Sequence, residues 1–153
     1  MPEERLPGSY DETRWTRADG LTLFYRDYAG GEGADTRLPV VCLHGLTRNS
    51  RDFADVAPRL ASQGRRVIVP EMRGRGLSDY APDSSTYTPL QYVADLEILF
   101  DELGFDRLIS VGTSMGGLIT MLMAATKPGR FAGVLMNDIG PVVDRAGLER
   151  IGG

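Results

Sequence analysis

Residues 108–116 read Leu-Ile-Ser-Val-Gly-Thr-Ser-Met-Gly, and they decide the fold of this 153-residue chain. An apolar strand over 108–111 runs directly into a helix-forming stretch, so Ser114 stands at a strand-to-helix corner. Gly112 and Gly116 let strand and helix approach closely, and the serine hydroxyl is then exposed at a helix N-terminus. The partial positive charge there and the Met115 backbone N–H favour negative charge that develops on a substrate oxygen. The alternative is a glycine-rich turn in which Ser114 only caps the helix.

Alternating strand and helix patterns surround this corner. Continuous apolar runs at 40–43, 67–69 and 133–136 predict further strands that are covered on both faces. Apolar residues at helical spacing predict helices over 53–61 and 90–103, and the corner opens a third helix over 115–126. Connections between parallel strands are right-handed crossovers. The predicted fold class is therefore α/β, with a mostly parallel, twisted sheet and helices on both faces.

Local signals support one of these helices and add a hairpin near the start. Thr88 and Gln91 form a capping-box pattern at the beginning of the helix over 90–103. Asp19-Gly20 suits the positive φ of a tight turn. It lies between two short strand patterns, so we expect an N-terminal β-hairpin from 14–18 and 21–28.

Composition indicates one globular domain. Apolar residues make up 42% of the chain and charged residues 25%, which is enough for a single core. The net charge of -4 without a dense Lys/Arg cluster argues against a nucleic-acid partner. No signal segment opens the chain, and no apolar run approaches the roughly 20 residues that cross a bilayer, so no membrane partner and a cytoplasmic location are expected. Cys42 is the only cysteine and is expected to be a buried core residue.

Two further motifs lie upstream of the corner. The strand at 40–43 opens into His44-Gly45-Leu46, a glycine turn that can bend toward a neighbouring site. Residues 71–78 read Glu-Met-Arg-Gly-Arg-Gly-Leu-Ser, and the arginines in this loop are interpreted as solvated or loop-bracing side chains. With the corner, these motifs stand in the order of the α/β-hydrolase superfamily, which the chain resembles over about residues 13–140. The loop at 71–78 looks like the family's D-x-R-G-x-G-x-S loop, with Glu71 in place of the usual Asp.

The resemblance implies roles for particular residues. Ser114 would be the nucleophile in a nucleophile elbow, and the backbone N–H groups of Leu46 and Met115 would form the oxyanion hole. Asp138, just past the strand at 133–136, is a tentative triad acid; the alternative is an exposed turn carboxylate. Four residues would support the motifs: His44, Gly45, Gly112 and Gly116.

In this family the order along the chain is nucleophile, acid and then histidine, with a lid usually inserted after the sixth strand. We therefore expect residues 1–153 to form a single incomplete α/β-hydrolase core domain, with strands 1–6 but without the lid and the C-terminal strands. The only histidine, His44, is expected to hold the geometry of the oxyanion turn. The alternative is a makeshift base, which would have to lie within hydrogen-bond reach of its proton.

These features predict a serine-dependent hydrolase of small carboxylic esters or related activated carbonyls, present as an N-terminal portion that lacks the triad histidine. A serine at position 114 disfavours the branches of the family that place an aspartate there. No metal or organic cofactor is implied. The isolated chain is expected to be nearly inactive. The alternative is a noncatalytic truncated chain, or half of a complex whose partner completes the sheet and the site; the apolar sheet edge at 133–136 also favours self-association.

Overall fold

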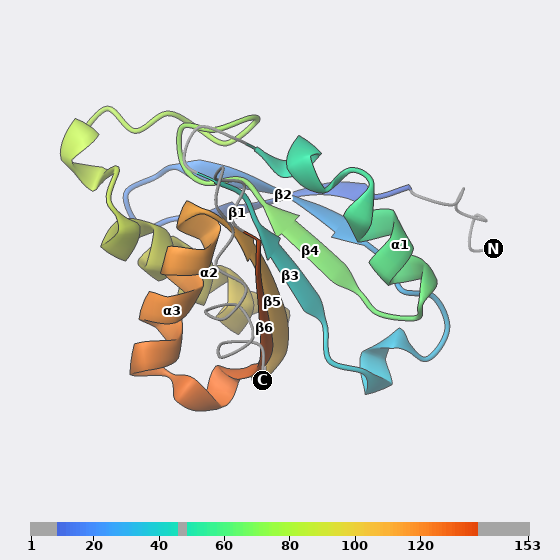
Figure 1. The fold of residues 1–153 in the computed structure, drawn as a ribbon. Helices are drawn as coiled ribbons and strands as arrows, with labels where there is room; N and C mark the ends of the chain where they lie inside the picture. Colours follow the sequence, from blue (N-terminus) through green and yellow to red (C-terminus); the bar gives the residue numbers. More distant parts are fainter. Residues whose placement is uncertain (1–8, 46–48, 138–153) are drawn as a thin grey trace.

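The described part of the chain folds around one six-stranded sheet (Figure 1). The structure, a computed structural model, describes residues 9–45 and 49–137. The strands lie in the order β1-β2-β4-β3-β5-β6. Their bounds are β1 (Asp11–Thr16), β2 (Thr22–Tyr28), β3 (Val40–Leu43), β4 (Val67–Pro70), β5 (Leu108–Thr113) and β6 (Phe131–Asn137).

Within the described residues, three α-helices and four short 3-10 helices connect the strands. The α-helices are α1 (Val56–Ser62), α2 (Pro89–Leu103) and α3 (Met115–Thr126). The 3-10 helices are η1 (Ala34–Thr36), η2 (Ser50–Phe53), η3 (Ser84–Thr86) and η4 (Pro128–Arg130). The predicted helix over 53–61 is thus divided into η2 and α1, whereas the helix that opens at the corner has the predicted bounds.

β2 is the one strand of this sheet that runs antiparallel to the others. β1 pairs antiparallel with β2, in a register that places Thr16 opposite Thr22, and Gly20 closes the turn with a φ of 88°. β2 is also antiparallel to β4, whereas β3 lies between β4 and β5 and is parallel to both. β5 pairs in parallel with β6 at the edge of the sheet. The expected mostly parallel sheet with an N-terminal hairpin is confirmed.

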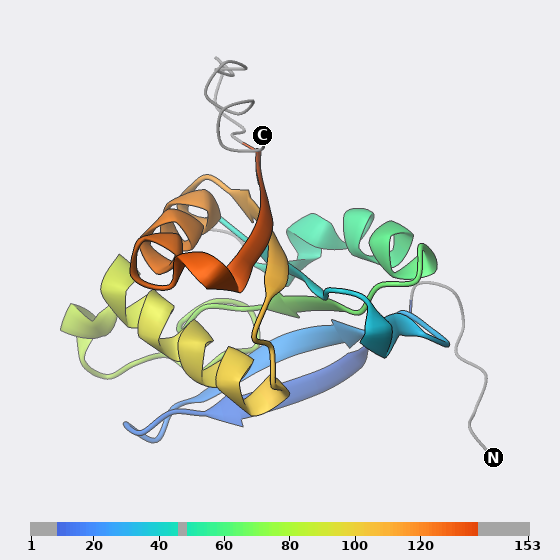
Figure 2. The same ribbon diagram turned by 90° about the horizontal axis from the view of Figure 1, so that it is seen from below.

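Helices cover both faces of the sheet, as predicted. In Figure 2, α1 lies on one face, while α2 and α3 lie on the other. Alternate residues of β3 enter two separate cores, because side chains of a strand point to opposite faces. Val41 and Leu43 join the core that contains residues of α2 and α3, whereas Val40 and Cys42 pack with Ala57 of α1. Burial raises the pKa of Cys42 to about 12, in agreement with its expected place in the core.

The start of α2 follows the predicted cap in part. The Thr88 side chain accepts a hydrogen bond from the Gln91 N–H (3.2 Å), and Gly104 ends the helix in a left-handed conformation with a φ of 72°. Gln91 does not close the capping box, because the Thr88 N–H donates to the carbonyl oxygen of Thr86 (2.9 Å), and the Gln91 amide nitrogen donates to Asp95 Oδ1 (3.0 Å). Leu90, which the apolar stripe had included, is 71% exposed.

No helix in the described part of the chain is long and apolar enough to span a membrane.

Candidate active site

The corner between β5 and α3 holds Ser114 in a rare backbone conformation. Its φ is 52° and its ψ is -113°, and among the described residues it is the one non-glycine residue with a positive φ. Residues in such sparsely populated regions store about 1–3 kcal/mol of strain each, and they cluster at functional sites. Ser114 is exposed, and its side chain makes no capping hydrogen bond to α3. The interpretation of Ser114 as a helix cap is therefore wrong.

Glycines make this corner possible because side chains would not fit beside it. A Cβ on Gly112 would lie 2.6 Å from the Gly117 backbone nitrogen, where strand and helix cross. A Cβ on Gly116 would overlap the carbonyl oxygen of Leu43 at the end of β3. Such contacts are closer than real Cβ atoms tolerate. Positions 112 and 116 must therefore be glycine for the start of α3 to pack against β3 and β5.

Hydroxyl groups fasten α3 to the strand that precedes the corner. Ser110 Oγ and Thr120 Oγ1 lie 2.8 Å apart, and both residues are buried. Thr120 Oγ1 also donates to the carbonyl oxygen of Gly116 (2.9 Å). Met115, the first residue of α3, is half-buried and packs against the core on the α2 and α3 side. The helix N-terminus beside Ser114 is consequently held in place by buried contacts.

His44 is fully buried at the end of β3, with both ring nitrogens bonded to the backbone. The Met72 N–H donates to His44 Nε2 (3.0 Å), so the proton lies on Nδ1, which donates to the carbonyl oxygen of Gly45 (2.7 Å). Burial lowers the pKa of His44 below its usual value of 6.5. The imidazole is thus neutral and fully engaged, and no ring nitrogen is left to accept a proton from Ser114.

Glu71 connects the segment after β4 to the segment after β3. Its carboxylate accepts hydrogen bonds from the backbone N–H groups of Ser50 (3.1 Å) and Leu77 (2.9 Å). A Cβ on Gly76 would overlap this carboxylate, and Gly76 itself has a φ of 52°. The segment after β3 is thus bonded to the loop after β4 at two points, between Ser50 and Glu71 and between His44 and Met72. Glu71 therefore makes loop contacts although it is longer than the usual Asp.

A buried ion cluster braces the same loop from the other side. Arg73 is fully buried, and its guanidinium forms a two-pronged ion pair with Asp95 of α2 at 2.8 Å. Arg73 also pairs with Asp19 in the hairpin turn (2.9 Å), and Arg17 reaches Asp95 (2.6 Å). Of the two interpretations of the loop arginines, loop bracing is confirmed for Arg73, whereas exposure to solvent is wrong for it.

The sheet brings the expected site segments to one edge. Leu43, which precedes His44-Gly45, lies directly opposite Gly112 in the parallel register of β3 and β5. The carboxyl ends of parallel strands are where open α/β sheets carry their sites. Leu46 and Asp138 lie outside the described residues.

Within residues 9–45 and 49–137, no group of three or more His, Cys, Asp or Glu side chains is arranged to hold a metal ion.

The sequence and the fold are similar to those of known proteins. A family model described as alpha/beta hydrolase fold matches residues 39–146. A 3-hydroxybutyrate-oligomer hydrolase from Cupriavidus necator is 41% identical over 122 residues, which are 80% of this chain and 41% of that protein. A non-heme chloroperoxidase from Streptomyces lividans is 33% identical over 130 residues, covering 84% of this chain and 45% of that protein.

Among solved structures, an alpha/beta hydrolase from Novosphingobium aromaticivorans is 54% identical with a TM-score of 0.79. This match covers 93% of the chain and 48% of the other chain. The chain therefore spans less than half the length of each of these relatives.

Proposed function

The chain belongs to the alpha/beta hydrolase fold family, and we propose that Ser114 is the nucleophile of a hydrolase that acts on small carboxylic esters. One observation carries this proposal: an exposed serine with a φ of 52° stands at a glycine-lined corner and does not cap its helix. A purely structural serine gains nothing from this conformation. The strain has a purpose if the hydroxyl must point away from both strand and helix toward a substrate.

In the proposed reaction, Ser114 Oγ attacks the ester carbonyl and its proton passes to a base. The carbonyl oxygen becomes an oxyanion, which the N–H groups of Met115 and Leu46 stabilise as hydrogen-bond donors. The alcohol leaves with the proton that the base returns, and an acyl group remains on Ser114. Water then releases the acid by the same route in a second step.

The base in this proposal is a histidine outside residues 1–153, because the chain holds one histidine and both of its ring nitrogens are engaged. Asp138 is proposed as the acid that orients that histidine. Without the histidine, a residual acceleration of only ~10³ to 10⁴ over water is typical, from binding and the oxyanion hole. The chain on its own should thus turn over esters very slowly.

Small hydroxyacid esters are the substrate class we favour within this proposal. The Cupriavidus necator relative, at 41% identity, is named for hydrolysis of 3-hydroxybutyrate oligomers, which are esters of a short hydroxyacid.

Labelling with a fluorophosphonate probe in the presence of concentrated imidazole tests the proposal. Imidazole acts as a diffusible base in place of the missing side chain, so labelling of the chain should rise with its concentration. The label should map to Ser114 and disappear in Ser114→Ala. It should persist in Ser62→Ala, which removes an exposed serine at the end of α1. Labelling that survives in Ser114→Ala, or no labelling at any imidazole concentration, would show that Ser114 is not the nucleophile.

A second candidate function is a noncatalytic chain, or half of a complex that a partner completes. The exposed apolar surface of the sheet favours it, because Leu135 in the edge strand β6 is 60% exposed. Its neighbours on that face, Ile109 and Val111 of β5, are only partly buried. An unpaired edge with apolar neighbours is a template for association. We propose self-association through β6, so a concentration-independent monomer in sedimentation would contradict this.

A further inference from the structure

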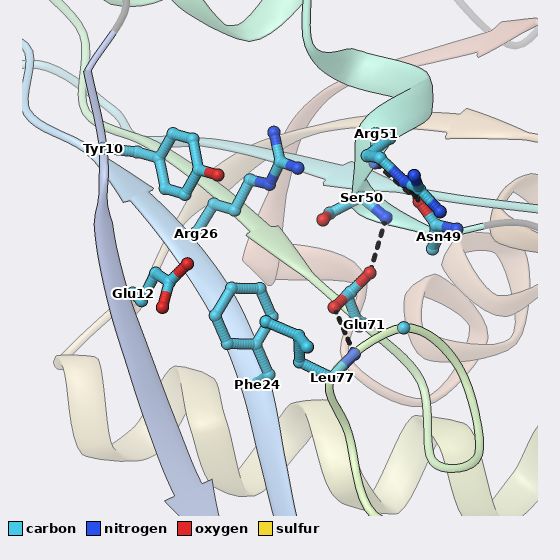
Figure 3. A pocket seen from close by; sticks show the side chains of 10 residues that line it. Tyr10, Glu12, Phe24, Arg26, Asn49, Ser50, Arg51, Glu71 and Leu77 are labelled. Carbon is cyan, nitrogen blue, oxygen red and sulfur yellow. Dashed lines mark hydrogen bonds between the residues drawn. The ribbon is translucent and has the colours of Figure 1, made fainter.

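We propose that a pocket between the N-terminal hairpin and η2 binds a small organic carboxylate with an apolar body. The pocket has a volume of about 380 Å³, which is within the range of small-molecule sites. Its walls come from β1, β2, η2 and the loop after β4 (Figure 3). Binding at this pocket does not depend on the proposed ester hydrolysis at Ser114.

The pocket lies apart from the corner at Ser114. None of the residues that line it belongs to β5 or α3. β2, which provides its floor, is separated from β5 by β4 and β3 in the sheet. Neighbouring strands are ~4.8 Å apart, so the two sites are about 14 Å apart across the sheet.

Arg26 and Arg51 line one side of this pocket, and neither forms an ion pair with another residue that the structure describes. The Arg26 guanidinium stacks over the Tyr10 ring at 4.4 Å, and its Nη1 donates to the Tyr28 hydroxyl (3.2 Å). Its Nε is buried and has no hydrogen-bond partner among the described residues. Figure 3 shows the guanidinium groups of Arg26 and Arg51 along the same side of the pocket. A half-buried guanidinium fixed by stacking is preorganised for a carboxylate, because it need not be immobilised when the ligand arrives.

The opposite side of the pocket is apolar. Figure 3 places Phe24 and Leu77 across from the two arginines. Phe24 is buried at 2% exposure, whereas Leu77 is 55% exposed at the rim, so a short hydrocarbon or aryl group that covers Leu77 removes apolar surface from water. A bare inorganic anion would leave this surface uncovered. The pocket thus fits a ligand with a charged end and an apolar body.

Two carboxylates, those of Glu12 and Glu71, also line the pocket and oppose the positive charge of the two arginines. Glu71 already accepts two backbone hydrogen bonds, from Ser50 and Leu77, so its charge is partly satisfied within the protein. Glu12 lies on the neighbouring strand, directly opposite Arg26 in the register, but no ion pair joins these two side chains. Glu12 consequently opposes an anionic ligand, and its removal should strengthen binding.

Fluorine NMR with 4-fluorobenzoate as the probe tests the proposal at low protein concentration and low salt. We expect saturable line broadening with a dissociation constant in the millimolar range. Arg26→Gln should weaken binding about tenfold or more, which corresponds to ~1.4 kcal/mol for each tenfold step. Arg51→Gln, at the exposed rim, should weaken it in the same direction without touching the stack on Tyr10.

Four controls separate this site from others. Arg59→Gln changes an exposed arginine of α1 and should leave binding unchanged, as should Ser114→Ala. Glu12→Gln should tighten binding several-fold. Inorganic phosphate should displace the probe only weakly.

The proposal is overturned if 4-fluorobenzoate does not saturate, or if Arg26→Gln and Arg51→Gln bind it as the wild type does. It is also overturned if Ser114→Ala abolishes binding, because the probe would then occupy the corner. Weaker binding of the probe in Glu12→Gln would show that the site does not select for negative charge, and phosphate binding as tight as that of the probe would exclude the apolar part. Either result would reject the assigned ligand class.

Discussion

Replacing Ser114 by glycine should make this protein more stable while removing the hydroxyl of the proposed nucleophile. Glycine adopts positive φ at no steric cost, whereas every other residue at φ 52° and ψ -113° is strained. Ser114→Ala is the matched control, because alanine also removes the hydroxyl but keeps the Cβ that causes the strain. The difference in the free energy of unfolding between the two variants therefore isolates the backbone strain.

The expected size of this difference follows from two opposing effects. Relief of strain at one such residue is worth about 1–3 kcal/mol. Glycine also gives the unfolded chain more conformational freedom, which costs about 0.4–1 kcal/mol relative to alanine. From the middle of each range, we expect Ser114→Gly to be more stable than Ser114→Ala by about 1.3 kcal/mol, and by about 2.5 kcal/mol at most.

Urea unfolding followed by tryptophan fluorescence is a suitable assay. Trp15 is the single tryptophan, is 3% exposed, and donates from its indole N–H to the carbonyl oxygen of Asp95 (2.9 Å). Its emission therefore reports on the core between the sheet and α2. Equal stability of the two variants, or a less stable Ser114→Gly, would refute the assignment of strain to this corner.

Three other changes give direct tests of the packing and the electrostatics. Asp95→Asn removes the charge that faces buried Arg73 and should lower the free energy of unfolding by about 3–5 kcal/mol in urea titrations. Asp101→Asn, at an exposed ion pair on the same helix, should change the free energy of unfolding little. Equal losses in the two variants would show that the buried ion cluster is no more stabilising than the exposed pair. Gly116→Ala forces a Cβ into the end of β3, so it should lower the free energy of unfolding by about 1–3 kcal/mol in the same assay and slow fluorophosphonate labelling. Gly129→Ala is the control, because a Cβ there has open space around it. Equal stability and equal labelling of the two variants would contradict this prediction. Because the pKa of His44 is lowered by burial, the unfolded chain takes up a proton near pH 6.5 while the folded chain does not. The free energy of unfolding should therefore be constant above pH 6.5 and fall below it by at most ~1.4 kcal/mol per pH unit. His44→Gln should remove this slope between pH 7 and 5.5, and a wild-type protein without the slope would contradict the burial of a neutral His44.

Sequence patterns predicted the elements of the fold because local signals and hydrophobic periodicity agree along most of the chain. The end of α2 at Gly104 and the bounds of α3 follow directly from residues whose conformational preferences are strong. The break between η2 and α1 was not predicted, since residues 53–61 keep one apolar spacing through it. Ser50 N–H bonds to Glu71 from a distant loop, and such a tertiary contact leaves no mark on the local pattern.

The same limit explains what was missed around the candidate site. Asp95 is buried together with Tyr92, Leu96 and Leu99 at helical spacing, so an acid in the buried stripe of α2 was a readable signal for a cationic partner. That partner, Arg73, is 22 residues earlier and could not be chosen over Arg75 from sequence alone. The corner at Ser114 was predictable because a glycine-serine-glycine spacing between strand and helix fixes its own geometry. The expected oxyanion donor Leu46 and acid Asp138 remain predictions.

A crystal structure of the phosphonate adduct, formed in the presence of imidazole, tests the central claim most directly. We expect a covalent bond between phosphorus and Ser114 Oγ, with a phosphonyl oxygen ~2.7–3.1 Å from the Met115 backbone nitrogen at the start of α3. An adduct on another residue, or a phosphonyl oxygen that turns away from the Met115 N–H, would contradict it.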